Sequence, residues 1–545
     1  MENNKRVLLA VALCLGILLA WQHFFPKYSL MGQPSNPQEQ AQSQAQPQAQ
    51  SQPRPQARPQ TPAEASMAAA EPLAGQPVTV TTPHYKAVIN TAGGILEHFS
   101  LNDYKLSIAP DSPDMDLIAE TATVRAPMGV IVDGQPTWQA VKWTTQAQDV
   151  DLGPGQSATL TFTGQMAGLT LERQLTFKAA TYLVEETLTL TSQTGGSAKV
   201  AFTLAGGSLT GGEANYNPTQ AVYLEGKSIE TMKDLAKLKD GKVIDSGGRW
   251  VGLESNYFIM ALLPQGESVL KLQHTDDVTR MAAEKESVNL PQGQPVKVLT
   301  AYYLGPKTPA ALAVAPDNLQ AAIDYGWFHV VAEGLLWLLR FLHQFVGNWG
   351  LDIMILTMFI KLIFWPLSQK SYRSMEKMRK LQPMMAAIRE KYPDDRNKMN
   401  EELMQLYKTY KVNPAGGCLP VVVQIPVFFG LYQALLNAIE LRHASFIHFL
   451  PFTHMVWLAD LSAKDPYYIT PLVMGATMFL QQKMTPAPGD PTQAKIMMFM
   501  PVIFTFMFLN FPAGLVIYWL VNNVLSIAQQ WMLMRSSRTA VRQKA

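Results

Sequence analysis

One lysine, Lys361, stands in the middle of an almost unbroken apolar stretch, residues 354–367 (MILTMFIKLIFWPL). An ammonium group inside hydrocarbon costs at least about 2.5 kcal/mol unless water or another polar group solvates it. Three arrangements would account for it: the general base of a serine nucleophile, a fixed charge that attracts polar peptide segments, or a long stem that reaches the membrane surface. The last is open to Lys361, because it lies six residues, roughly 9 Å, from the end of its stretch.

The apolar stretches carry four sets of polar side chains, and those within 470–481 and 519–530 each recur at helical spacing and so share one face of a helix. The sets are Thr357, one turn before Lys361; Gln424, Gln433 and Asn437; Thr470, Thr477 and Gln481; and Trp519, Asn523, Ser526 and Gln530. Hydrogen bonds between helices explain any one set alone. Together with a lysine, the four sets predict a shared hydrophilic cavity, because polar faces turn away from lipid.

No acidic residue lies in the middle of these stretches, since Asp352 and Glu440 are both near their ends. Lys361 is therefore expected to be hydrated or to pair with a negatively charged visitor. The same absence argues against a proton-coupled transporter, although a sugar-recognising β-domain attached to a transporter stays an alternative. An intramembrane hydrolase with Lys361 as base and Ser526 as nucleophile is a second alternative, weakened because no nucleophile motif or oxyanion hole is visible.

No cofactor, metal, nucleotide or small-molecule substrate is expected. HExxH and zinc-type His/Cys spacings are absent, and AVYLEGKS (221–228) has Ala221 where a phosphate loop requires glycine. The two cysteines, Cys14 and Cys418, lie in or beside apolar runs, which excludes a disulfide framework.

Apolar composition indicates how these residues are positioned: 48% of the 545 residues are hydrophobic and mean hydropathy is +0.01. We predict six membrane spans, at 7–25, 349–367, 419–439, 467–482, 496–510 and 515–534. Basic residues precede the first span and follow the last, and residues 368–417 hold eleven Lys or Arg against six Asp or Glu. By the positive-inside rule, both termini and the 368–417 loop are cytoplasmic. A cleaved signal peptide competes with an uncleaved anchor at 7–25, but no A-x-A site follows.

The remaining segments have distinct patterns. Residues rich in Gln, Pro and Ala cannot form a core and indicate a disordered tether. Period-two alternation, as in LTLERQLTF (169–177) and YLVEETLTLT (182–191), predicts an antiparallel β-sandwich. Its histidines, His84, His98 and His274, form no constellation with acids, so a structural or docking domain is favoured over an enzyme.

Two further helical patterns border the spans. In GWFHVVAEGLLWLLRFLHQFV (326–346), the polar residues His329, Glu333, Arg340 and Gln344 share one stripe, which indicates a helix lying in the membrane interface. In 368–417, apolar residues repeat at helical spacing on both sides of KYPDDR, which predicts a helical hairpin whose positive charge suits anionic lipid or RNA.

These patterns divide the chain into nine segments. They are a cytoplasmic N-terminus (1–6), an uncleaved signal-anchor span (7–25), a disordered tether (26–77), a periplasmic β-sandwich (78–308), a linker with an interfacial amphipathic helix (309–348), the second span (349–367), a cytoplasmic helical hairpin (368–417), spans three to six (418–534) and a basic cytoplasmic tail (535–545).

The last spans have two features suited to handling apolar peptides. Those at 467–482 and 496–510 are short and contain Pro471 and Pro501, and short spans thin the bilayer around them. Of the 27 methionines, 18 follow residue 350, and flexible thioethers accept varied apolar partners. Ordinary gap-filling is the commoner explanation for methionine, but the combination favours a slide for hydrophobic segments.

Four stretches carry a resemblance to a known family: VGNWGLDIMILTMFIKLIFWPLSQKSYRSMEKMRKLQP, YKVNPAGGCLPVVVQIPVFFGLY, KDPYYITPLVMGATMFLQQKM and FMPVIFTFMFLNFPAGLVIYWLVNN. They resemble the YidC family of membrane protein insertases, which extends to mitochondrial oxidase-assembly and chloroplast albino insertases. The resemblance implies a multi-pass inner-membrane protein with a five-helix core and a hydrophilic groove. It also implies a periplasmic β-supersandwich like that of sugar mutarotases.

The resemblance also implies residue roles and partners. Lys361 matches the position of the groove's positive charge, commonly arginine in the family, and Trp519 replaces what is often tyrosine. Groove charge and hydration are expected at Lys361, Thr357, Gln424, Asn523 and Ser526, and a substrate slide at Ile425, Phe428, Met474, Tyr518 and Trp519. The implied function is non-enzymatic insertion of nascent membrane proteins, alone or with a Sec-type translocon. A ribosome contact through the hairpin and tail, and contacts with anionic lipids, are further expectations.

Overall fold

The computed structural model describes residues 75–210, 217–245, 247–393, 395–412, 419–484 and 491–542. The chain divides into two compact units, Met1–Glu64 and Ala65–Ala545, and the first lies wholly outside the described residues. The predicted cytoplasmic N-terminus, the signal-anchor span at 7–25 and nearly all of the tether at 26–77 therefore also lie outside them.

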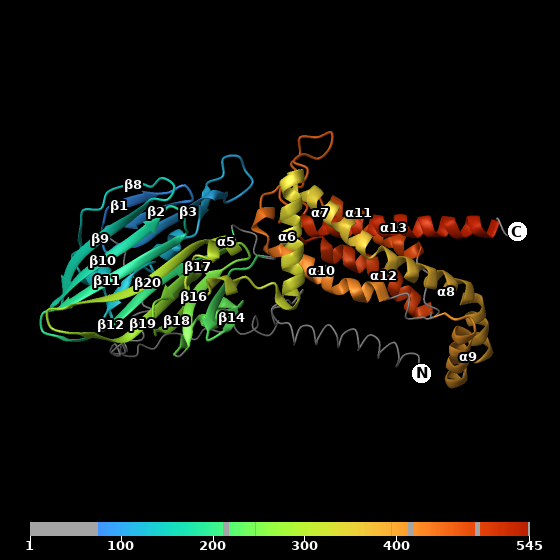
Figure 1. Ribbon diagram of the computed structural model, residues 1–545, viewed down its shortest axis with the longest axis horizontal. Coiled ribbons are helices and arrows are strands. Elements are labelled where there is room, and N and C mark those ends of the chain that lie inside the picture. The colour runs from blue at the N-terminus through green and yellow to red at the C-terminus, as the bar shows by residue number, and fades with distance from the viewer. Residues whose placement is uncertain are drawn as a thin grey trace, which may run out of the picture. The chain divides into compact units, whose positions relative to one another are not determined.

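The first half of the described chain is built from β-strands that form three sheets (Figure 1). The five-stranded sheet has the order β4 (Asp114–Asp116), β3 (Ile95–Lys105), β2 (Tyr85–Asn90), β1 (Pro77–Thr81), β8 (Val150–Asp151). The nine-stranded sheet has the order β14 (Ser228–Met232), β13 (Gln220–Glu225), β16 (Gly248–Glu254), β17 (Phe258–Pro264), β20 (Pro295–Pro306), β11 (Leu183–Ser192), β10 (Leu169–Lys178), β9 (Ser157–Met166), β7 (Thr144–Thr145). The six-stranded sheet has the order β15 (Lys242–Ile244), β18 (Val269–Thr275), β19 (Val278–Leu290), β12 (Gly196–Gly206), β5 (Val130–Val132), β6 (Gln135–Pro136).

Period-two alternation in the sequence becomes alternating burial in the strands. In β10, every second residue from Leu169 to Phe177 is buried, and the intervening residues are partly exposed. Its neighbours β9 and β11 pair with it in antiparallel register, and among the described strands only β1 and β8 pair in parallel. The predicted antiparallel sandwich is confirmed, with a core formed by the inward-facing side chains of several sheets.

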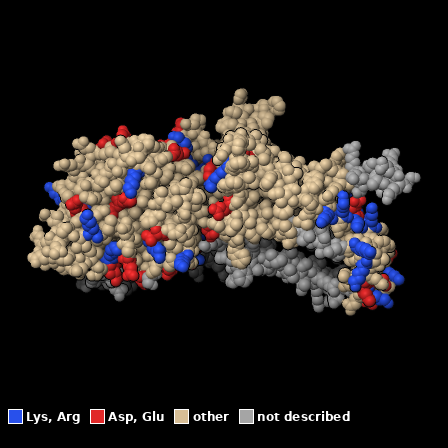
Figure 2. Space-filling view, in the orientation of Figure 1, with Lys and Arg blue, Asp and Glu red and all other residues tan. Residues whose placement is uncertain are grey.

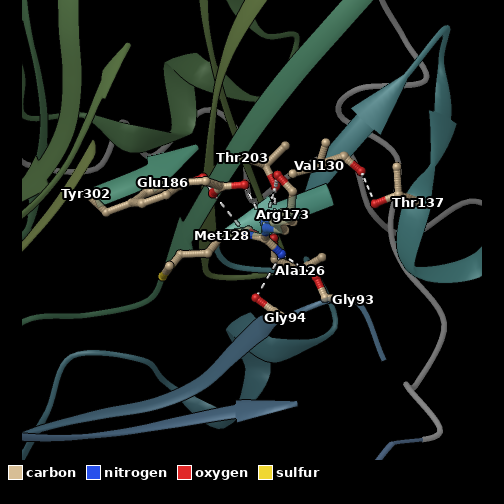
Figure 3. A network of polar contacts seen from close by, with 11 residues as sticks. Gly93, Gly94, Ala126, Met128, Val130, Thr137, Arg173, Glu186, Thr203 and Tyr302 are labelled. Atoms are coloured by element: carbon tan, nitrogen blue, oxygen red, sulfur yellow. Dashed lines mark hydrogen bonds and ion pairs between the residues drawn. The ribbon is translucent and has the colours of Figure 1, made fainter. Parts of the chain in front are cut away.

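One inward position of β10 holds a charge, Arg173, which the sequence analysis did not single out. Its guanidinium is fully buried and donates through Nε to Glu186 Oε1 at 2.6 Å and through Nη2 to Oε2 at 3.0 Å. It also donates to the carbonyl oxygens of Gly93, Gly94 and Met128, and the Tyr302 hydroxyl donates to Glu186 at 2.8 Å (Figure 3). Burial alone would lower the pKa of Arg173, but Glu186 and Tyr302 together raise it above its ordinary value.

Helices make up most of the chain after the last strand. The short ones are α3 (Glu120–Thr123) and α4 (Thr137–Ala140) within the sandwich, and α5 (Pro309–Leu312) after it. The long ones are α6 (His329–Val346), α7 (Trp349–Ile363), α8 (Trp365–Lys391), α9 (Arg396–Thr409), α10 (Leu419–Asn437), α11 (Ile469–Met484), α12 (Pro491–Phe508) and α13 (Ala513–Arg542). Turns of 3-10 helix occur at Leu235–Leu238, Leu319–Ala322, Gly326–Phe328 and Ile439–Leu441.

The predicted second span, 349–367, is not one straight helix. α7 ends at Ile363, Phe364 lies between the helices, and α8 begins at Trp365 with a bend of 64°. Pro366 occupies the first turn of α8, where it has no amide hydrogen to donate and so favours a new helix start over continuation. Helix α7 therefore ends four residues before the predicted end of the second span at residue 367.

By length and hydropathy together, none of the helices in the described ranges qualifies singly as a membrane crossing. The bent pair α7 and α8 passes the same test jointly, and the segments Val422–Asn437 and Met497–Phe508 are apolar helices of shorter length.

The 368–417 loop contains two helices, α8 and α9, that pack on each other. Leu381 and Met385 of α8 form a small core with Leu403 and Val412, and the Tyr407 hydroxyl contacts Met385 Sδ at 3.7 Å. Asp395 caps α9 by accepting from the Lys398 amide at 3.0 Å. The residues that repeat at helical spacing in the sequence are thus the ones that join the two helices.

The buried Arg173–Glu186 pair generates a stability prediction. Replacing Glu186 by Ala leaves an uncompensated guanidinium in the core and should lower the free energy of unfolding by about 3–5 kcal/mol. Glu185→Ala is the matched control on the same strand, because Glu185 pairs with Lys178 at the surface and its loss should cost less than about 1 kcal/mol. Pulse proteolysis of the full chain across a urea series measures both, and equal midpoints would contradict the prediction.

Candidate functional site

Lys361 lies in the last turn of α7, and its side chain reaches α13. The Nζ atom donates to Ser526 Oγ at 2.8 Å, and Ser526 Oγ in turn lies 2.7 Å from the Asn522 carbonyl oxygen. Within the described residues Lys361 forms no ion pair with a carboxylate. The ammonium is therefore solvated by a neutral hydroxyl and keeps donors for other partners.

Buried polar side chains of α13 extend this contact along one helix face. Asn523, Ser526 and Gln530 follow one another at intervals of about one turn, and all three are buried. Tyr372 of α8 hydrogen-bonds to Ser526 and Gln530; burial raises the pKa of its hydroxyl, and these two hydrogen bonds act in the opposite direction. We call Lys361, Tyr372, Asn523, Ser526 and Gln530 the polar seam, which joins α7, α8 and α13.

Two more predicted residues, Gln424 and Thr357, differ in whether they contact α13. Gln424 of α10 donates to Asn522 Oδ1 at 3.2 Å, so it joins α13 one turn before Ser526. Thr357 is buried, and its hydroxyl donates to the Ile353 carbonyl oxygen of its own helix at 2.6 Å. The structure therefore brings Lys361, Ser526 and Gln424 to one stretch of α13, and it gives Thr357 a local partner instead.

The aromatic residues predicted as a slide cluster where α10 meets α13. The Phe428 ring is 4.7 Å from the Trp519 ring in an edge-to-face arrangement and 6.4 Å from the Tyr518 ring. Phe428 and Trp519 are half-buried, and Ile425 is exposed. Met474 and Tyr518 are buried in the core of the helical region, so contact of these two side chains with a substrate would require that core to open.

The hydrogen-bond directions at Ser526 bear on the hydrolase alternative. A carbonyl oxygen only accepts, so the Ser526 hydroxyl donates its proton to Asn522. Lys361 must then be the donor to Ser526, whereas a general base would accept the proton of the hydroxyl. The two side chains lie within reach of each other, as the alternative required, but in the opposite hydrogen-bonding sense.

Two ion pairs at the other end of the helical region were not predicted from the sequence. Arg340 of α6 donates to Glu440 at 2.7 Å, so it is not part of a freely solvated stripe. His343 lies 2.7 Å from the buried carboxylate of Asp352 and stacks on Trp349 at 3.7 Å. The signal available in the sequence was the position of two acids beside apolar runs. Glu440 lies a hundred residues after its partner Arg340, whereas Asp352 lies only nine residues after His343.

The basic side chains of the helical region gather over the segment that is rich in Lys and Arg in the sequence. Figure 2 shows Lys and Arg gathered over α8 and α9, next to a broad surface without charged side chains. Large apolar side chains are exposed on α7, α11 and α12, including Leu362, Leu480 and Phe506. Exposed apolar surface of this extent is typical of contact with lipid or with other proteins.

Comparison with known proteins gives the class first. Residues 341–540 match the family model described as 60Kd inner membrane protein, and residues 77–338 match the one described as YidC periplasmic domain. Membrane protein insertase YidC of Nitratidesulfovibrio vulgaris is 51% identical to this chain, over 98% of this chain and 100% of that relative's own length. The protein of that name from Maridesulfovibrio salexigens is 50% identical over 98% of this chain and 99% of its own length.

The chain belongs to the YidC family of membrane protein insertases. Its relatives are named for insertion and for no enzymatic reaction. A solved structure titled "Active YidC insertase crystal structure with the first transmembrane domain resolved" is similar to it with a TM-score of 0.36 and 19% identity, over 84% of this chain and 94% of that chain.

The helices that carry the site approach closely at a glycine, which generates a packing prediction. A Cβ at Gly475 of α11 would overlap Thr505 of α12, whereas a Cβ at Gly334 of α6 would meet open space. Gly475→Ala should therefore lower the melting temperature of the purified protein, through an overpacking cost of about 1–3 kcal/mol. Gly334→Ala should leave it unchanged or raise it, because alanine favours the helix.

A second substitution checks the cause. Thr505→Ala removes the overlapping hydroxyl and methyl groups, so the double variant should recover most of the stability lost in Gly475→Ala. Equal melting temperatures for Gly475→Ala and Gly334→Ala would rule out the close approach as the reason for the glycine.

Proposed function

We propose that this protein inserts nascent hydrophobic segments from the cytoplasm into the inner membrane without nucleotide. The name of its relatives, membrane protein insertase, supports the insertion itself. The observation that carries the proposal is the contact between Lys361 and Ser526, which turns a cation toward a buried polar seam; among the described residues this cation has no acidic partner. A cation held in this way can attract polar or acidic ends of a substrate and release them, because no carboxylate of the described part of the chain pairs with it.

The site residues divide into two groups in this proposal. Lys361, Thr357, Gln424, Asn523 and Ser526 provide charge and hydration in a groove open to the cytoplasm and to lipid. Ile425, Phe428, Met474, Tyr518 and Trp519 form the apolar slide along which the hydrophobic segment moves into the bilayer. The exposed Ile425 and the half-buried pair Phe428 and Trp519 are the positions a substrate would meet first.

The proposed topology has six spans with both termini in the cytoplasm and the β-sandwich in the periplasm. The described helices α7, α10, α11, α12 and α13 then form the five-helix core, and the anchor at 7–25 supplies the sixth span. Support comes from the basic residues over α8 and α9 and from the apolar surface beside them (Figure 2). The nine segment boundaries predicted from the sequence belong to this proposal, and the bend between α7 and α8 falls within the second span, 349–367.

The short apolar helices have a physical consequence in this topology. The apolar part of α12, Met497–Phe508, covers roughly 18 Å at 1.5 Å per residue, against a hydrocarbon core of about 30 Å. A locally thinned bilayer would lower the barrier for moving a polar segment outward. The α8–α9 hairpin and the basic tail are the proposed contacts for ribosomes and anionic lipids, and a Sec-type translocon is a proposed partner.

The charge of Lys361 is testable with three substitutions. Lys361→Ala should slow insertion of a single-span substrate with an acidic outer segment into proteoliposomes by roughly tenfold, which corresponds to about 1.4 kcal/mol of lost stabilisation. Lys361→Arg should preserve insertion, and Lys361→Glu should slow it further by repulsion. Lys237→Ala, which removes an exposed charge of the β-sandwich, is the matched control and should have little effect.

Two results would contradict this account. Full insertion by both Lys361→Ala and Lys361→Glu would show that the charge is dispensable. Cleaved substrate that disappears in Ser526→Ala would favour the hydrolase instead, whereas the insertase predicts intact substrate from every variant.

A further inference from the structure

A short β-hairpin, residues 446–458, projects between α10 and α11. Its base is closed by a hydrogen bond from the Phe446 amide to the Leu458 carbonyl at 2.9 Å, and Phe449 forms an antiparallel bridge with Val456. The Leu450 amide donates to the Met455 carbonyl at 2.9 Å, which leaves four residues, 451–454, at the turn. We call this segment the outer hairpin.

The outer hairpin exposes large apolar side chains beside the polar residues Thr453 and His454 of its turn, which is unusual for a segment in water. Phe452 is fully exposed, and Phe449, Met455 and Val456 around it are also exposed. Between Arg442 and Asp460 the sequence contains no Asp, Glu, Lys or Arg. A turn that projects into water normally carries polar residues, so this one is suited to an apolar environment.

The base of the hairpin is fixed to the start of α7. Asn348 Nδ2 donates to the Phe446 carbonyl at 3.1 Å, and the Phe446 side chain fills the space beside Gly350, where a Cβ would collide with its ring. Trp457 Nε1 donates to Asp465 Oδ1 at 2.9 Å. The hairpin therefore leaves the corner between α6 and α7 in a defined direction.

That direction is sideways from the helical region. In Figure 1 the orange loop above α6 and α7 extends along α6, across the direction of α7 and α13, and Figure 2 shows a protrusion there without charged side chains. α6 has its own exposed aromatic residues, Trp337, Phe341 and Phe345, and the last of these lies next to the same corner. Two uncharged, aromatic-rich surfaces thus lie at one end of the α7 axis.

We propose that the outer hairpin inserts its tip into the interface of the outer membrane leaflet and holds the ends of α7, α10 and α11 at that depth. The occupant of this surface is lipid, because aromatic and methionine side chains without charge suit the headgroup boundary and because α6 continues the same surface. The inference rests on the proposed topology, in which the ends of these helices face the periplasm.

Depth can be measured with a fluorophore attached to single cysteines in the full chain. With Cys14 and Cys418 replaced by Ser, an environment-sensitive dye is placed at Phe452→Cys in proteoliposomes of phosphatidylethanolamine and phosphatidylglycerol that contain nitroxide lipids. Lys237→Cys, 74% exposed in the sandwich, is the aqueous control, and Met358→Cys, an exposed apolar position in the interior of α7, is the membrane control.

We expect blue-shifted emission at Phe452→Cys and stronger quenching by a nitroxide near the headgroups than by one deep in the acyl chains. Emission and quenching equal to those of Lys237→Cys, with Met358→Cys still quenched by the deep nitroxide, would overturn the inference and leave the topology standing. Blue-shifted emission without quenching by any lipid would also overturn it, in favour of a protein partner. An unquenched Met358→Cys would instead refute the membrane placement of α7 on which both rest.

Discussion

The structure depends on how a single ammonium group is accommodated among apolar helices. Lys361 has hydrocarbon-type neighbours along α7, and it turns to Ser526, whose hydroxyl is already committed to a backbone carbonyl. This arrangement solvates the charge without neutralising it. The polar side chains of α8, α10 and α13 near Lys361 lower the free-energy cost of keeping a cation at this depth.

The β-sandwich also buries a cation, but there a carboxylate neutralises it. Arg173 is fully buried, but Glu186 pairs with it through two hydrogen bonds and backbone carbonyls take its other donors. A charge neutralised so completely stabilises one arrangement of the loops around it and leaves no donor for a ligand. The contrast separates a cation neutralised within the fold from one that, in the proposed function, meets a substrate.

Much of the architecture could be predicted from local patterns, because alternation and helical spacing report which face of an element is buried. The strands around Leu169–Phe177 and the hairpin of α8 and α9 are examples. Contacts between distant residues could not be predicted in this way. The sequence placed Arg340 on the polar stripe of an interfacial helix but did not reveal its partner Glu440, which lies a hundred residues later. The new helix that begins beside Pro366 was not predicted either.

The central claim is that a nascent chain passes the cation and the aromatic cluster beside it, and crosslinking tests this most directly. A photoreactive amino acid at Phe428 or Trp519 should crosslink a stalled, ribosome-bound membrane protein as its hydrophobic segment emerges. The same group at Phe506, an exposed apolar position of α12, should give little product. Equal crosslinking at all three positions, or none at Phe428 and Trp519, would contradict the account.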